Sequence, residues 1–243
     1  MTPTGISTPF QWLRAAATVF LTGLILLSAE IIVVAARFFP GDSKPVLTME
    51  LVPSLAAANP MLHDTDSAEG GRRRAAMDSI QYLDFLFIPC YAGLFFCVSL
   101  AIGTTASPPW KWLAWLGIPA ILSAAVFDVL EDLRILAVTS GVDTSVRHWG
   151  IPKWEAFFAA LLLLAAPLVF ARRENRLATV AATVGGLAAA IVGGIGLYGG
   201  VAGSDSVLTI GANLAPAPLL PLSLWLFVNH RAEAPQSKSA AAG

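Results

Sequence analysis

Five acidic residues lie within or at the edges of long apolar segments of this chain: Glu30, Asp84, Asp128, Glu131 and Asp132. An ionised carboxylate near the bilayer centre costs about 2.5–3.5 kcal/mol on insertion scales, so such groups are rare and usually functional. Carboxylates in this setting can bind a proton or a metal cation, pair with an organic amine, or act as general acid and base. The chemistry of this chain is therefore expected to depend on these five groups.

Three of the five fall in the segment VFDVLEDLR, residues 126–134, which also contains Arg134. A helix turns about 100° per residue, which places Asp128 and Asp132 about 40° apart on one stripe. The spacing of Glu131 and Arg134 predicts an ion pair between them. Asp128 and Asp132 are then like charges that coexist if one holds a proton or if a cation lies between them. The segment is predicted to form the wall of a polar cavity.

The composition indicates which elements must position these groups. The chain has 243 residues, of which 56% are hydrophobic and 13% are charged. The charged fraction is about half that of a typical soluble domain, and the mean hydropathy is +0.70. We predict an all-α, polytopic bundle of about six transmembrane helices, which forms a single domain over residues 1–230. The predicted spans are residues 15–38, 80–102, 112–138, 154–171, 177–202 and 207–228, with an extramembrane loop at 39–79 and a disordered tail at 231–243.

Successive spans alternate in direction, yet their polar groups fall in the same half of the membrane, on the side of loop 39–79. At 1.5 Å per residue, Glu30 lies about 12 Å deep, Asp128 about 15 Å and Asn213 about 9 Å. Tyr91 shares a helix face with Asp84. These side chains are therefore expected to line one pocket that opens toward the long loop.

The last two spans have unusual compositions. The fifth contains Gly196-x-x-x-Gly200 and Gly199-x-x-x-Gly203, a spacing that lets another helix approach closely, so a homo-oligomer through this helix is one expectation. The sixth contains Pro216, Pro218 and Pro221, which should kink or break the helix.

Charge restricts the partners and the location. A net charge of −1 argues against nucleic acid as a partner, and the apolar spans make the lipid bilayer the main one. The expected location is the cell membrane, the inner membrane of a bacterium. Three arginines crowd the short connection after the fourth span, which favours cytoplasmic termini: Arg172, Arg173 and Arg176.

Two motifs resemble segments of uncharacterised bacterial polytopic membrane proteins. YLDFLFIPCY contains the Asp-x-Leu-Phe…Tyr pattern of those proteins, and AAVFDVLEDLRIL contains their Asp-x-x-Glu-Asn/Asp pattern. The match covers about the first two thirds of the chain, with Asp132 at a position where Asn is more common. The resemblance implies no particular activity.

Three functions fit these features. The first is binding or movement of a proton, a cation or a small cationic solute, for which the binding residues would be Glu30, Asp84, Tyr91, Asp128, Glu131, Asp132, Arg134 and Asn213. The second is an intramembrane enzyme for a lipid or isoprenoid substrate, with Asp128 as the acid and Glu30 or Asp132 as the base. The third is a scaffold subunit of a membrane complex. The cofactor is left open; a divalent cation on Asp84, Asp128 and Asp132 is the candidate, because oxygen ligands suit Mg²⁺, Ca²⁺ or Mn²⁺.

Overall fold

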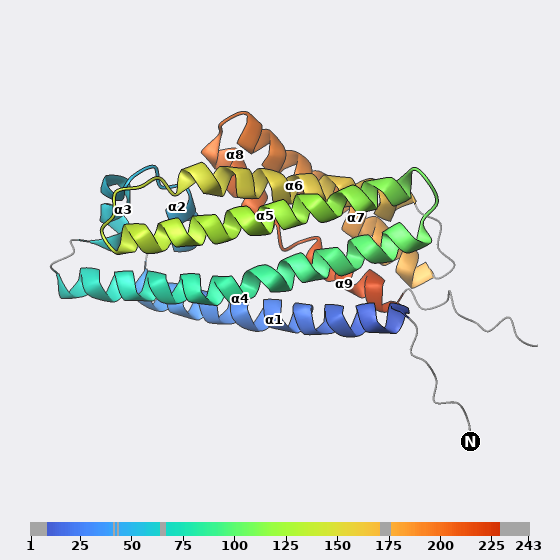
Figure 1. Cartoon of the computed structure of the whole chain (residues 1–243), viewed down its shortest axis with the longest axis horizontal. Helices are drawn as coiled ribbons and strands as arrows, with labels where there is room; N and C mark the ends of the chain where they lie inside the picture. The colour runs from blue at the N-terminus through green and yellow to red at the C-terminus, as the bar shows by residue number, and fades with distance from the viewer. Residues whose placement is uncertain (1–8, 41, 43, 64–66, 171–175, 229–243) are drawn as a thin grey trace, which may run out of the picture.

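The computed structural model describes residues 9–40, 42, 44–63, 67–170 and 176–228. Within these residues the regular structure is entirely helical, and six helices are long and apolar enough to cross a membrane. The predicted fold class is thus confirmed: the chain is an all-α, multi-pass membrane protein. Figure 1 shows the long helices running side by side in one bundle. The tail predicted to be disordered, residues 231–243, lies outside the described residues.

Five crossings are single helices, and the sixth is divided. The single helices are α1 (Pro9–Phe38), α4 (Ala68–Thr105), α5 (Trp110–Thr139), α6 (Arg147–Phe170) and α7 (Arg176–Val201). The sixth crossing consists of α8 (Asp205–Leu214) and α9 (Leu219–Val228), and the loop after α1 carries α2 (Pro45–Glu50) and α3 (Leu55–Leu62). Neighbours in sequence are neighbours in space: α1 packs along α4, α4 along α5, α5 along α6 and α6 along α7, which α8 and α9 cover.

The break in the sixth crossing lies at the prolines, as predicted. Pro216 and Pro218 have no backbone N–H to donate within a helix, so the chain leaves α8 at Leu214 and passes through turns to α9. One of these turns is closed by the N–H of Ala217, which donates to the carbonyl of Leu214 at 2.9 Å.

The helix of the second crossing, α4, begins at Ala68, twelve residues before the predicted start of the span. Ser67 caps it, with its hydroxyl accepting from the N–H of Gly70 at 2.9 Å. Arg74 is buried in this added segment and donates to the carbonyls of Val138 and Thr139, at 3.3 and 3.0 Å. Both carbonyls lie at the end of α5, so the arginine holds the two helices together at the loop side.

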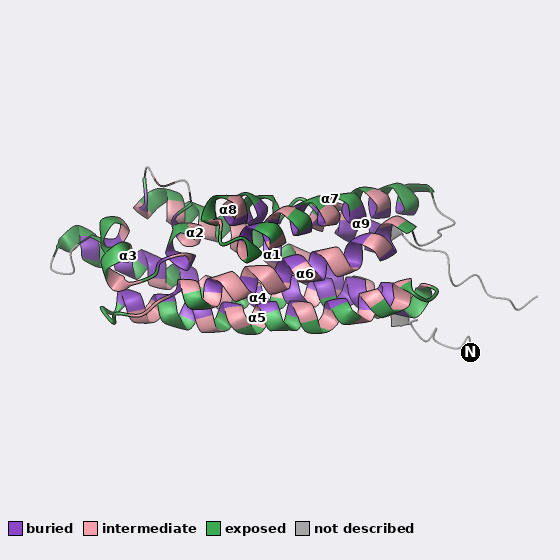
Figure 2. Ribbon diagram, turned by 90° about the horizontal axis from the view of Figure 1, so that it is seen from above, coloured by how far each residue is buried: buried purple, intermediate pink, exposed green. Residues whose placement is uncertain are grey.

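The glycine-rich face of α7 is used for packing within the chain. A Cβ on Gly196 would come within 2.2 Å of the ring of Phe158 on α6, and one on Gly199 within 2.3 Å of the backbone nitrogen of Leu208 on α8. Figure 2 shows the buried residues concentrated between the helices and the exposed ones along the outer faces. A homo-oligomer through α7 stays a prediction.

The helices α2 and α3 close the loop-side end of the bundle. Their buried side chains join a separate hydrophobic cluster with side chains of α4, α5 and the connecting segments: Phe39, Met49, Val52, Ala58, Leu62, Ala76, Met77, Ile80, Ile135, Val138 and Val146. The backbone N–H groups of Val146 and Arg147 both donate to the carbonyl of Val52, each at 3.1 Å. The segment that carries α2 and α3 is therefore packed onto the end of the bundle.

Candidate functional site

Lys153 lies at the centre of the acidic side chains. Its residue is 5% exposed, and its ammonium nitrogen is 2.8 Å from Oε1 of Glu50 and 3.0 Å from Oδ1 of Asp128. The same nitrogen also pairs with Oε2 of Glu131. The ammonium group on α6 thus joins one carboxylate from α2 and two from α5.

Two aromatic side chains fix the orientation of these carboxylates. The hydroxyl of Tyr91 on α4 donates to Oδ2 of Asp128 at 2.8 Å. The indole N–H of Trp154 donates to Oε2 of Glu50, also at 2.8 Å. Both oxygens of Asp128 and both oxygens of Glu50 therefore have a partner, and neither carboxylate can turn without breaking a charge-assisted bond.

The acidic cluster extends from Asp128 to Asp84 and Asp132. One carboxylate oxygen from each of these three residues lies within 4.8 Å of the others, a spacing at which they could share a cation. Asp132 is 1% exposed, and within the described residues its buried Oδ2 has no hydrogen-bond partner. Oε1 of Glu131 is likewise buried without a hydrogen-bond partner among these residues. An orphaned buried oxygen costs about 1–3 kcal/mol, which a bound proton or cation would relieve.

The helical period explains why α5 supplies three of the acids. Asp128, Glu131, Asp132 and Ile135 follow the i, i+3, i+4, i+7 pattern of one helix face, and all four are buried. Gly150 on α6 lets α2 come close to this face. A Cβ on Gly150 would stand 2.6 Å from the backbone oxygen of Glu50 and 2.8 Å from Oε1 of Glu131.

A pocket of about 500 Å³ leads to the acidic cluster. Four charged side chains are among those that line it: Asp84, Asp128, Glu50 and Lys153. The rest of its wall is mainly apolar and comes from six helices, α1, α2, α4, α6, α8 and α9, and from the break in the sixth crossing: Ser28, Ile31, Ile32, Val46, Ile80, Phe87, Tyr91, Trp154, Phe157, Ala212, Ala215, Pro216 and Leu219. The site is therefore an apolar chamber with a charged end.

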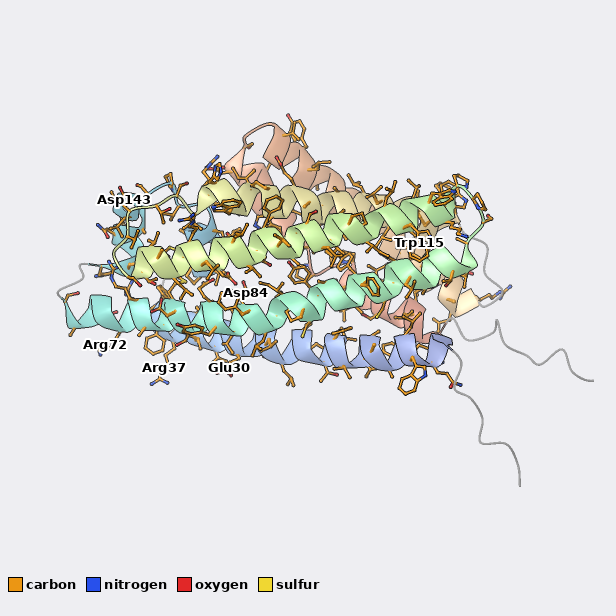
Figure 3. The ribbon with its side chains drawn as sticks, in the orientation of Figure 1. Glu30, Arg37, Arg72, Asp84, Trp115 and Asp143 are labelled. Carbon is orange, nitrogen blue, oxygen red and sulfur yellow. The ribbon has the colours of Figure 1, made fainter. Side chains whose placement is uncertain are left out.

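The structure brings together five of the side chains predicted for the binding site: Asp84, Tyr91, Asp128, Glu131 and Asp132. It does not bring Glu30 to them. Glu30 is exposed on α1, about 200° around the helix from Ser28, which faces the pocket. In Figure 3 Glu30 projects from the outer side of α1, whereas Asp84 lies on the inner side of α4.

Two further predicted residues also lie outside the cluster. Arg134 is exposed, about 120° around α5 from Asp128, so the predicted ion pair with Glu131 is wrong: Glu131 pairs with Lys153 instead. Asn213 is exposed and donates to the carbonyl of Thr209 within α8, although its neighbours Ala212 and Ala215 line the pocket.

Two residues of the cluster, Lys153 and Glu50, are not among the predicted site residues. Lys153 precedes the predicted fourth span, but α6 begins at Arg147 and carries the lysine more than a turn into the helix. Glu50 lies in the loop, on α2, which folds back against the bundle. One signal was available: several carboxylates in the membrane without a facing cation require a basic residue from a span end.

No family model, no curated protein and no solved structure matches this chain.

Proposed function

We propose that this membrane protein binds a positively charged small solute, with an ammonium group as the best fit, at the acidic end of the pocket. The observation that carries the proposal is the charge balance around Lys153. Five carboxyl groups, from Glu50, Asp84, Asp128, Glu131 and Asp132, share one ammonium group. Full ionisation would leave four negative charges uncompensated in apolar surroundings, where charge is expensive. Protons or a bound cation must neutralise them.

The size and lining of the pocket favour an organic ammonium ion. A volume of about 500 Å³ lies within the usual range for small-molecule sites, whereas a bare metal ion would fill little of it. Aromatic faces attract cations, and four aromatic side chains line this pocket: Phe87, Tyr91, Trp154 and Phe157. The matching ligand has a cationic head and an apolar body.

Such a site supports exchange of a cation for protons. Carboxyl groups in apolar surroundings hold protons when no other cation is present, and an arriving ammonium ion takes over their role. Asp84 is the carboxyl group best placed to exchange a proton for the ammonium ion, because it lines the pocket. None of the ion pairs among the described residues involves it. Exchange of this kind is the half-reaction that a proton-coupled transporter needs.

The test is calorimetric titration of the purified protein in lipid nanodiscs with n-butylammonium, and with n-butanol as the uncharged analogue. We expect n-butylammonium to bind with release of protons, detected from the buffer dependence of the heat, and n-butanol to bind at least about tenfold more weakly. Asp84→Asn should weaken n-butylammonium binding by about tenfold, and Glu30→Gln should leave it unchanged. Equal binding of the two analogues, or full binding by Asp84→Asn, would contradict the proposal.

A second candidate function is metal-assisted chemistry on a lipid or isoprenoid. The observation that favours it is the spacing of Asp84, Asp128 and Asp132, whose oxygens could be ligands of one divalent cation. The test is electron paramagnetic resonance of Mn²⁺ added to the nanodisc sample. The candidate requires a bound Mn²⁺ signal that Asp132→Asn abolishes and Glu30→Gln retains; free Mn²⁺ throughout the titration would exclude it.

A further inference from the structure

One wall of the pocket lies between α1 and the broken sixth crossing. Ser28, Ile31 and Ile32 line it from α1, and Ala215 and Leu219 line it from the other side. In the described part of the chain, α1 packs mainly along α4 and meets α9. The contact with α9 includes a bond near the start of α1, where Arg14 donates to the carbonyl of Phe227 at 2.9 Å. Between that contact and α2, the two sides are separated by the pocket.

The break in the sixth crossing lies beside the acidic cluster. Ala215 and Pro216 in the break line the same pocket as Asp84 and Asp128. The non-helical segment between α8 and α9 therefore borders the pocket beside its charged end.

The outer edges of this wall face the hydrocarbon of the bilayer. Ile32 is 65% exposed on α1, and Leu214 and Leu220 are 40% and 68% exposed on either side of the break. These are apolar side chains on membrane-crossing helices, so lipid chains are their surroundings. The pocket thus meets lipid at its side.

The water-facing end of the pocket is closed. Glu50, at the end of α2, bonds to both Lys153 and Trp154 above the acidic cluster. The chain after α2 is tied to the start of α6 through Val52, and the N–H of Leu55 donates to Asp143 at 2.9 Å. A ligand that reaches the cluster from water must displace these contacts, whereas a ligand in the bilayer need not.

We infer that the ligand is a membrane-dissolved amphiphile, a single-chain alkyl ammonium compound, which enters sideways between α1 and the α8–α9 break. This inference rests on the proposed function and names the substrate class for the same site. The ammonium head binds at Asp84 and Asp128, and the alkyl chain lies along the apolar wall with its end toward the lipid. The ammonium head of the ligand compensates the negative charge of the carboxylates. The alkyl chain of the ligand stays in apolar surroundings during entry and binding.

The experiment uses dodecylammonium with a diazirine at the end of its chain, added to the full-length protein in phosphatidylcholine nanodiscs and activated by light. We expect adducts on Ile31, Ile32 and the segment 212–219, which excess unlabelled dodecylammonium prevents. Ser28→Trp places a large side chain in the space between α1 and the α8–α9 break and should reduce these adducts by about tenfold. Ala29→Trp changes the next residue, which is exposed to lipid, and should leave the adducts unchanged. Both variants are first required to match the unfolding temperature of the unaltered protein.

The outcomes separate this inference from the proposed function. If adducts spread evenly over lipid-facing residues such as Leu122 and Ile191, or if Ser28→Trp keeps the unaltered pattern, sideways entry of an amphiphile is wrong. The proposed function still stands in that case if n-butylammonium binds in an Asp84-dependent way. Loss of the adducts in Asp84→Asn as well as in Ser28→Trp would support both.

Discussion

The ammonium group of Lys153 on α6 and the carboxylate of Glu50 on α2 form a buried ion pair, with Nζ 2.8 Å from Oε1. Glu50 is 6% exposed and Lys153 is 5% exposed. This pair connects the loop between the first two crossings to the centre of the membrane bundle. The contact by which α2 closes the end of the pocket therefore depends on the charge of the acidic cluster.

Glu50→Gln should loosen α2 without unfolding the bundle. The substitution removes the charge that holds the Lys153 and Trp154 bonds, and bonds to charged groups contribute about 1.5–3 kcal/mol. We expect amide hydrogen exchange in residues 45–55 to accelerate by about tenfold or more. Glu30→Gln, the same change on the exposed face of α1, is the control and should leave exchange unchanged. Equal exchange in the two variants would mean that the pair does not hold α2.

Lys153→Met should destabilise the whole protein. Removing one partner from a buried ionic network costs about 3–5 kcal/mol, because the remaining carboxylates lose their compensating charge. The expected result is a large fall in the unfolding temperature in detergent. Unfolding is measured by the reaction of a thiol-specific dye with Cys97, which is buried in the folded protein. Lys44→Met, at an exposed position of the loop, should have little effect. An unaltered unfolding temperature in Lys153→Met would show that the cluster does not depend on the lysine.

Gly150→Ala should separate α2 from α6. The new Cβ would stand 2.6 Å from the backbone oxygen of Glu50, which cannot move without shifting α2. Overpacking of this kind costs about 1–3 kcal/mol. The measurement is again amide exchange in residues 45–55, together with the unfolding temperature. Gly194→Ala is the control: it lies in α7 with no neighbouring heavy atom within 4 Å of the added Cβ, and it should be neutral or stabilising.

Arg74→Met should weaken the loop-side end of α4 and α5. Its guanidinium group donates to the carbonyls of Val138, Thr139 and His63 from a buried position, and the loss of these bonds should cost about 1.5–3 kcal/mol. Faster proteolysis of the chain around residues 55–75 is the expected result. Arg72→Met provides the comparison, because Arg72 pairs with Glu69 at the surface, where ion pairs contribute about 0–1 kcal/mol. Equal proteolysis in both variants would show that the buried arginine has no special role.

Local sequence patterns were sufficient to predict the class of fold and the face of α5 that carries the acidic residues. Six long apolar segments require helices in a bilayer, because every backbone polar group must be bonded within its own segment. The spacing of Asp128, Glu131 and Asp132 placed them on one side of a helix, and the prolines placed the break between α8 and α9. These features depend on local geometry, which the sequence by itself determines.

The partners of these groups were decided by tertiary structure. Spacing within α5 favoured Arg134 as the partner of Glu131, but packing turns Arg134 outward and brings Lys153 from α6 to the acidic face. Depth alone grouped Glu30 with the other acids, yet the rotation of α1 about its axis leaves it exposed. Glu50 joins them only because α2 folds back against the bundle. Helix rotation and loop folding depend on contacts between distant segments, and these contacts decide which charges are buried together.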